Sequence, residues 1–244
     1  MAKVKLPPNY NQTNFKKSSD AVLYDNSALT LKLNNLSRLQ VSEIGRTILQ
    51  SENLENFRRN LKVGLGEDFF DETENIHWEK VGSPSVSNGV LYTSSGNYIQ
   101  SKEQITFGGA DFTISFWATF SGGGTLFTTS DNLLQIVSGS STFNFVYNGT
   151  TQNNVISGAN SLSYVEINYS HSAGRIYLYK NGAYCIAPSV SLSRAARNVI
   201  LGNMSATFKE FRILDGICAH TAAFTPPSED YSLTDNTVSL LHFN

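Results

Sequence analysis

The stretch from Ala110 to Phe120 constrains the fold of this chain more than any other. Its side chains alternate between apolar and mostly polar, the pattern of a β-strand with one face toward a core and one toward solvent. A strand this rich in aromatic residues needs a second apolar sheet to cover it. Short alternating segments follow, so the sequence predicts an all-β, antiparallel sandwich. The apolar face carries Phe112, Ile114, Phe116, Ala118 and Phe120, and the other face carries Thr113, Ser115, Trp117 and Thr119.

The composition allows a large core and excludes several function classes. Of 244 residues, 40% are hydrophobic and 16% are charged, and the net charge is −2. Nucleic-acid binding needs a clustered positive surface, so we expect none. No apolar run is long enough to span a membrane and no secretory signal follows Met1, so we expect a protein made in a cytoplasm without membrane insertion. Cys185 and Cys218 are expected to be buried and unbridged.

Residues 1–66 have a different pattern from the rest. The first 40 or so residues are interpreted as extended, and apolar residues then recur at helical spacing from Val41 to Lys62. This helix is either a lid on the sandwich or an inter-subunit bundle, because a short apolar stripe needs a partner surface. The candidate oligomerisation residues are Ile44, Ile48, Leu54, Phe57 and Leu61.

Two Asn-Gly pairs, Asn88-Gly89 and Asn181-Gly182, predict tight hairpins, because this pair best tolerates two successive positive φ angles. Glycine and serine at 122–124 and 138–141 are interpreted as loops between strands. The predicted strands that we expect to form the sandwich are 125–129, 133–137, 143–147, 164–170, 198–202, 207–214 and 238–243.

Four blocks of this sequence carry a likeness to a known family: residues 68–72, 107–117, 175–182 and 211–227. Together they resemble the laminin-G-like, concanavalin A-like jelly roll of tailed-phage structural proteins. The resemblance spans about residues 67–244, which implies a domain of that kind behind an N-terminal arm of residues 1–66. It departs from the family at Ser163–Asn168, where the family often has Trp-His, and at Lys209-Glu210, where an acidic residue is usual. The departures weaken the transfer of any ligand or calcium site.

Nothing in the sequence predicts catalysis. Glycosidases of this sandwich class place two carboxylates at alternating strand positions, and no Glu-x-Asp-x-Glu occurs. Acidic residues between Glu67 and Glu74 are interpreted as solvated surface. The four histidines lack metal-ligand spacing, so we expect a protein that is not an enzyme. They are His77, His171, His220 and His242.

Two kinds of ligand site remain open. Asp131, Asn132 and Asn148 could supply hard oxygen ligands to calcium, although such residues more often form turns, so no cofactor is expected. An exposed tyrosine beside amide groups suits a sugar, although such a tyrosine is also an ordinary sandwich cap. The glycan-contact candidates are Tyr147, Asn148, Asn153, Asp131 and Asn132.

The resemblance implies a virion structural protein: a capsid decoration, head fibre or tail-associated protein that displays a lectin-like sandwich. Residues 1–66 are then the docking and oligomerisation segment, with a trimer as the first expectation. The expected partners are other virion proteins and a host-surface glycan, and the expected location is the virion, assembled in the host cytoplasm. The alternative is a carbohydrate-binding module or lectin that acts independently of a particle, with its specificity in predicted loops at 121–125, 130–132, 138–142 and 147–154. A cell-surface adhesion protein is the weakest interpretation.

Overall fold

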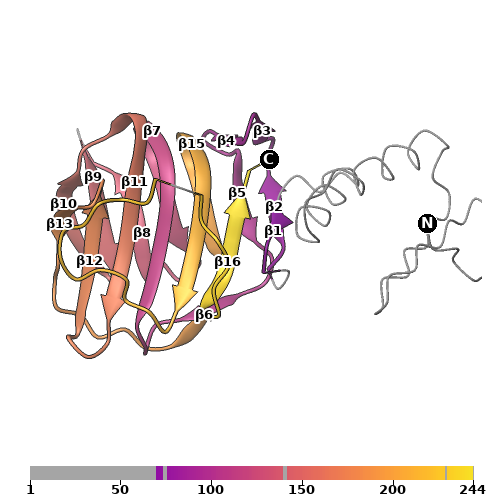
Figure 1. Ribbon diagram of the computed structural model, residues 1–244. Helices are drawn as coiled ribbons and strands as arrows, with labels where there is room; N and C mark the ends of the chain where they lie inside the picture. The colour runs from indigo at the N-terminus through magenta and orange to yellow at the C-terminus, as the bar shows by residue number, and fades with distance from the viewer. Residues whose placement is uncertain (1–69, 74–75, 140–141, 229, 244) are drawn as a thin grey trace, which may run out of the picture. The chain divides into compact units, whose positions relative to one another are not determined.

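The computed structural model describes residues 70–73, 76–139, 142–228 and 230–243. They form an all-β, antiparallel sandwich of the jelly-roll type, which confirms the predicted fold class (Figure 1). No helix within these ranges is both long and apolar enough to cross a bilayer. The predicted arm, its helix and the predicted domain boundary lie outside the described residues. So do the five predicted oligomerisation residues, Ile44, Ile48, Leu54, Phe57 and Leu61.

The strands of the described residues are β1 (Phe70–Asp71), β2 (Trp78–Val81), β3 (Ser85–Ser87), β4 (Val90–Thr93), β5 (Tyr98–Ser101), β6 (Ile105–Phe107), β7 (Phe112–Thr129), β8 (Leu134–Ser138), β9 (Phe143–Tyr147), β10 (Thr150–Ile156), β11 (Ala159–Ser170), β12 (Arg175–Lys180), β13 (Ala183–Ile186), β14 (Ala195–Arg197), β15 (Val199–Asp215) and β16 (Thr237–His242). The strands are arranged in two layers, and the long strands β7 and β15 belong to both of them. The first layer has the order β13-β12-β11-β7-β15-β16-β1, and the second has the order β10-β9-β8-β7-β15-β5-β2.

The core lies between the two layers and is built on the predicted alternation. The inward residues of the first half of β7 are 0–1% exposed. Phe116 stacks on Phe127 of the same strand, with ring centroids 6.3 Å apart, and also packs against Phe208 and Phe211 of β15. Because Phe116 and Phe127 belong to different layers, this contact shows how β7 passes from one layer to the other around the core.

The segment Gly122–Gly124 is not the loop that the sequence predicted. It continues β7, and the strand changes partner there, from β11 to β8. Gly124 has φ +132°, and a Cβ atom on it would lie 2.5 Å from the carbonyl oxygen of Asn203. Glycine is needed because the chain bends while β7 stays paired with β15.

Both predicted Asn-Gly hairpins are confirmed. Asn88 and Gly89 have φ of 52° and 72° and join β3 to β4, while Asn181 and Gly182 have φ of 51° and 72° and join β12 to β13. Positive φ at both positions is the mark of a type I′ turn, whose twist matches the flanking strands.

A third turn of this kind went unrecognised in the sequence. Asn148 and Gly149 have φ of 45° and 75°, and they join β9 to β10. The stretch interpreted as a loop at 147–154 is therefore mostly strand β10, although it carried the same Asn-Gly signal.

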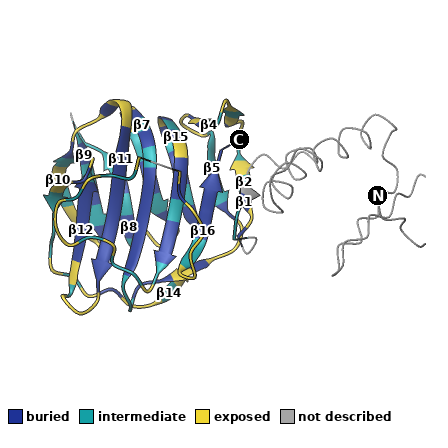
Figure 2. Cartoon of the chain, viewed as in Figure 1, coloured by how far each residue is buried: buried dark blue, intermediate teal, exposed yellow. Residues whose placement is uncertain are grey.

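The outer face of the first layer is covered by the segment between β15 and β16, residues 216–228 and 230–236, which we call the C-terminal strap. The strap crosses β7 and its neighbours in Figure 2, where these strands are largely dark blue. Thr113 and Ser115 on the polar face of β7 are both 0% exposed. At Thr113 and Ser115, the prediction that this strand is buried on one face only is thus wrong, because the strap covers the second face there.

Backbone groups of the strap are bound by side chains of this polar face. Thr113 Oγ1 donates to the Ile217 carbonyl at 2.8 Å, and the Ala219 amide donates to Asn168 Oδ1 at 3.0 Å. A covering segment without strand pairing needs such partners, since buried backbone groups are costly when unpaired.

Candidate functional site

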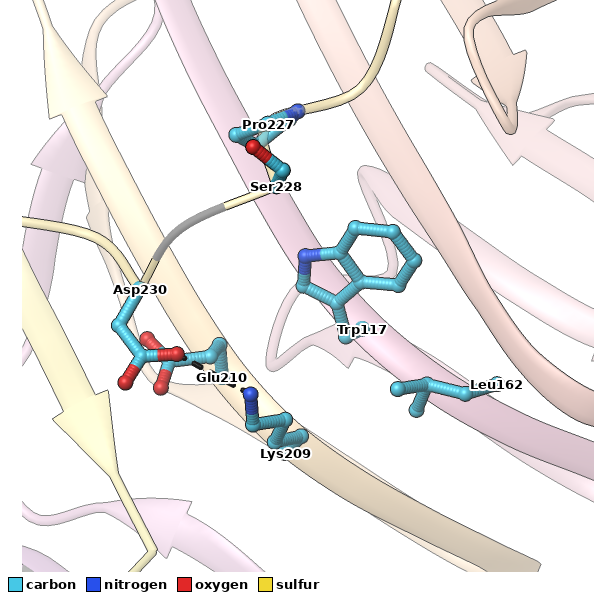
Figure 3. A pocket seen from close by; sticks show the side chains of 7 residues that line it. All are labelled: Trp117, Leu162, Lys209, Glu210, Pro227, Ser228 and Asp230. Carbon is cyan, nitrogen blue, oxygen red and sulfur yellow. Dashed lines mark hydrogen bonds and ion pairs between the residues drawn. The ribbon is translucent and has the colours of Figure 1, made fainter.

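A pocket of about 170 Å³ opens on the outer face of the first layer, beside the C-terminal strap. Figure 3 shows the indole of one tryptophan in its centre, charged side chains on one side of the ring and a leucine on the other. We call it the Trp117 pocket. Its lining residues are Trp117, Leu162, Lys209, Glu210, Pro227, Ser228 and Asp230.

Two irregularities in strand pairing place the pocket at Trp117. On the β15 side, the register shifts between Phe208 and Glu210, so that Lys209 is an extra residue opposite β7. On the β11 side, the register shifts between Ala159 and Ser163, the stretch that contains Leu162. Bulges re-aim side chains and are common next to functional sites. Here they bring residues to the pocket that regular pairing would turn away.

The Trp117 ring is held by aromatic neighbours. It meets Tyr164 of β11 edge-on, with centroids 5.3 Å apart, and Tyr164 in turn meets Phe224 of the strap at 5.9 Å. The strap covers Tyr164, which is 1% exposed, but it leaves Trp117 partly exposed. A fixed, partly exposed aromatic ring is a suitable surface for a flat apolar ligand face.

Glu210 is the buried charge of the pocket, at 4% exposed. Its Oε1 lies 2.7 Å from His242 Nδ1, and His242 Nε2 lies 3.5 Å from Glu72 Oε1. Among the described residues, the one hydrogen bond to its Oε2 is long, at 3.4 Å from the Tyr231 amide. One carboxylate oxygen is therefore firmly held, and the other retains capacity to accept a hydrogen bond from a ligand.

The rim of the pocket carries an exposed ion pair. Lys209 Nζ lies 3.1 Å from Asp230 Oδ1, and both side chains are about half exposed or more. Such a pair adds little stability because water and salt screen it. Its groups are accordingly available to exchange partners with a ligand.

Beneath the strap, Glu166 is the centre of a buried hydrogen-bond network. Its Oε2 accepts from the Tyr164 hydroxyl, and its Oε1 accepts from Asn168 Nδ2, both at 2.5 Å. The strap adds His220, whose Nδ1 lies 2.6 Å from Glu166 Oε1 and whose ring stacks on Phe224. Burial raises the pKa of Tyr164 far above its ordinary value, so this hydroxyl remains a donor. The network fixes the strand and strap residues that support Trp117.

Tyr147, the predicted sugar-stacking residue, lies in the core. It is 5% exposed, packs against Phe145 with centroids 5.7 Å apart, and accepts a hydrogen bond from Gln152 Nε2 at 3.1 Å. Its ring face is thus covered, which argues against the predicted stacking. The reason is the alternation of β9, which turns Phe143, Phe145 and Tyr147 inward together.

The structure brings three of the four other glycan candidates to one end of β8 and β9. Asp131 and Asn132 precede β8, and Asn148 follows β9, with the Asn148 amide donating to the Leu133 carbonyl at 2.8 Å. Asn132 and Asn148 are exposed and have positive φ angles, as turn residues do. Asn153 is separate from them, within β10. A glycan contact at these four residues stays a prediction.

Asp131 already has partners in the fold. It accepts from Thr129 Oγ1 at 2.8 Å and the Leu133 amide at 3.1 Å, and it pairs with Arg197 Nε at 2.6 Å. Among the residues that the structure describes, no three or more acidic, histidine or cysteine side chains gather to hold a metal. A calcium ion at Asp131 would have to compete with the buried Arg197 guanidinium.

Asp71 was wrongly interpreted as solvated surface. It is 4% exposed and accepts hydrogen bonds from Trp78 Nε1 at 3.2 Å, from the Leu240 amide at 3.2 Å and from Ser239. The carboxylate thus joins β1 to β16. Cys185 and Cys218 are both free, as predicted, although each is only partly buried.

The sequence contained one sign of the Trp117 pocket that went unused. On the outer face of β7, Trp117 is a large aromatic residue among Thr113, Ser115 and Thr119. The departure from the family pattern at Lys209-Glu210 marked the opposite wall. The two signs belong to one pocket because Glu210 of β15 pairs with Trp117 of β7, and no local pattern in the sequence reveals this pairing.

Comparison with known proteins finds similar folds only. No family model matches the chain, and no curated protein matches it. The binding domain of botulinum neurotoxin serotype D matches with a TM-score of 0.44 and 12% identity, over 57% of this chain and 43% of that one. The chain therefore spans less than half of that domain.

Two carbohydrate-binding structures are also similar. Domain 4 of the arabinanase AbnA from Geobacillus stearothermophilus, solved with arabinotriose, has a TM-score of 0.45 and 14% identity, over 59% of this chain and 85% of that one. The carbohydrate-binding module CBM66 from Bacillus subtilis has a TM-score of 0.37 and 16% identity, over 54% of this chain and 91% of that one. All three TM-scores are below 0.5, so the fold assignment rests on the strand pairing itself.

Proposed function

We propose that the sandwich is a non-catalytic glycan-binding module and that the Trp117 pocket is its binding site. The observation that carries this proposal is a partly exposed indole, fixed by Tyr164, beside a hollow with hydrogen-bonding groups on its wall. The apolar face of a sugar ring stacks on an aromatic ring, while its hydroxyl groups pair with polar side chains. Glu210 Oε2, Ser228 and the Lys209–Asp230 pair supply such groups.

The arrangement supports binding better than hydrolysis. Glycoside hydrolysis needs two carboxylates that act from opposite sides of the scissile bond. In the Trp117 pocket, Glu210 is held by His242 and Asp230 is paired with Lys209 at the rim. Both acids lie on the same side of the indole in Figure 3.

The test is affinity electrophoresis of the full chain through gels that each contain one polysaccharide. We expect retardation in at least one gel and a loss of about tenfold in affinity for Trp117→Ala, since an aromatic contact contributes about 1 kcal/mol or more. Tyr92→Ala is the matched control, because Tyr92 is an exposed aromatic residue on β4 outside the pocket. Equal retardation of wild type and Trp117→Ala would overturn the proposal. Release of reducing ends from a polysaccharide would show that the protein is a hydrolase and not a non-catalytic binding module.

We also propose that this module is displayed on a virus particle, as a decoration, fibre or tail-associated protein. The support is the sequence resemblance of residues 67–244 and the helical pattern of residues 1–66. The partners would be other virion proteins and a host-surface glycan, with assembly in the host cytoplasm and no cofactor. The described residues all belong to the compact unit Leu65–Asn244.

Light scattering tests this second proposal. We expect the full chain to be a trimer or larger and a version that begins at Gly66 to be a folded monomer. If both versions are monomers, the N-terminal helix is a lid on the sandwich, and the alternative is favoured, a lectin that acts independently of a particle.

A further inference from the structure

We propose that the Trp117 pocket selects glycans by charge: it prefers sugars with a free amino group, accepts neutral sugars less well, and disfavours those with carboxylate or sulfate groups. This inference rests on the proposed glycan-binding function and names the ligand class of the same site. It follows from the charges of the lining, their burial and the position of the indole.

The lining of the pocket contains two carboxylates and one ammonium group, so it is more negative than positive. The single ammonium, on Lys209, already faces the Asp230 carboxylate at 3.1 Å. Among the described lining residues, an acidic sugar would meet Glu210 without a second cation to balance it. A protonated amine would instead add the missing positive charge.

The burial of Glu210 gives its charge more effect than that of an exposed acid. Interactions between charges strengthen as the surroundings exclude water, and Glu210 is 4% exposed. His242 and the bulge at Lys209 hold the carboxylate at the pocket wall. Within the described part of the chain, its Oε2 accepts one hydrogen bond, the 3.4 Å contact from the Tyr231 amide. A ligand ammonium group can donate to this oxygen, and charge-assisted hydrogen bonds are stronger than neutral ones.

The indole acts in the same direction. The face of a tryptophan ring attracts cations because of its quadrupole, and it offers nothing comparable to an anion. In the pocket, the Trp117 ring lies between Leu162 on one side and the acidic groups on the other (Figure 3). An amino group close to the ring and to Glu210 would gain from both, whereas an acetylated amine would lose the charge.

The experiment compares three oligosaccharides of equal length by isothermal titration against the full chain at about pH 6, where an aliphatic amine is protonated. The probes are oligomers of glucosamine, N-acetylglucosamine and galacturonate. We expect affinity to fall in that order. In Glu210→Gln, which keeps the side-chain shape and removes the charge, the preference for glucosamine over galacturonate should shrink by about tenfold.

Asp230→Asn is the second variant, because Glu210→Gln removes a charge that His242 contacts and could disturb folding. Asp230 is exposed at the rim, so this variant should fold normally and reduce the same preference by a smaller factor. Thermal unfolding of both variants shows whether each is folded before it is titrated.

The outcomes separate this inference from the proposed function. If wild type binds at least one probe and Trp117→Ala weakens it, the glycan function stands. Equal affinities for the three probes, a preference for galacturonate, or an unchanged preference in both charge variants would then overturn the charge selection alone. Absence of binding to all three probes and to the polysaccharide gels would overturn both.

Discussion

At the start of β7, from Phe112 to Phe116, both faces of the strand are buried, but by different means. The inner face carries Phe112, Ile114 and Phe116, which pack against the second layer. The outer face carries Thr113 and Ser115, which lie beneath the C-terminal strap. Alternating polarity in a sequence therefore shows which side chains share a face, but not whether the polar face reaches water.

The two faces differ in how they contribute to stability. Apolar burial is roughly proportional to area and has no direction, so a core tolerates changes that preserve volume. Hydrogen bonds contribute little net stability, yet a buried group that loses its partner is costly. We therefore expect the inner face to respond to lost volume and the outer face to changes of polarity at constant volume.

The largest effect should follow loss of volume on the inner face. Phe116→Ala removes a ring that contacts Phe127, Phe208 and Phe211, and we expect it to lower the free energy of unfolding by about 3–5 kcal/mol. Urea denaturation measures this change. Tyr92→Ala, on an exposed ring, is the control, and a comparable loss there would contradict the role of the core.

A polarity change on the outer face should have an intermediate effect. Glu166→Gln keeps the volume but replaces one acceptor by a donor that faces the Tyr164 hydroxyl or the Asn168 amide. We expect a loss of about 1–3 kcal/mol in urea denaturation. Glu103→Gln is the matched control, because Glu103 pairs with His77 at an exposed site. Removing the Glu103 charge should therefore lower the free energy of unfolding only slightly. Equal costs for the two variants would mean that the covered network contributes no more than a surface pair.

The strap itself can be tested through a pair of glycines. Gly182 and Gly89 occupy the same position of two type I′ turns, both at φ +72°, so alanine strains the backbone equally in each. A Cβ on Gly182 would also collide with the Phe224 carbonyl of the strap, whereas one on Gly89 would lie 3.4 Å from the Phe243 carbonyl. We expect Gly182→Ala to cost about 1–2 kcal/mol more than Gly89→Ala.

Hydrogen exchange locates the effect of these glycine variants. The Phe224 amide donates to the Gly182 carbonyl at 3.1 Å, and it should lose protection in Gly182→Ala but keep it in Gly89→Ala. Equal protection in both variants would show that the strap does not depend on this contact.

The smallest expected effect concerns the alkylation rate of the Cys218 thiol and does not involve the free energy of unfolding. Burial, together with the charges of Asp111 and Glu166, raises the pKa of Cys218 to about 11. In a Cys185→Ser background, alkylation of Cys218 at pH 8 should be on the order of a hundredfold slower than that of a free thiol, and it should keep rising beyond pH 10. A rate that levels off near pH 9 would indicate that the strap leaves Cys218 open to water.

The sequence could predict features that depend on neighbours in the chain. The alternation along β7 and the Asn-Gly pairs at 88–89 and 181–182 act within a few residues, so strands and hairpins were found from them. The same rules would also have identified the hairpin at Asn148-Gly149 and the inward position of Tyr147 beside Phe143 and Phe145. These two were missed because a polar loop was expected there.

Features that depend on distant segments could not be found in this way. The burial of Thr113 and Ser115 requires a strap about 100 residues later in the chain. The Trp117 pocket requires that β11 and β15 both lose regular register next to the same residue of β7. A shift of one residue in either strand would turn Leu162 or Lys209 away, and nothing local in the sequence specifies that shift.

The pairing of β7 with β15 along their whole length has a consequence for synthesis of the protein. The partners in this ladder are roughly 70 to 100 residues apart in the chain, so the central pair of strands cannot form until β15 has left the ribosome. At usual translation rates the aromatic β7 waits about 5–20 s for its partner. During that time its apolar face is open to chaperones or to other nascent chains, and neither layer can be completed first.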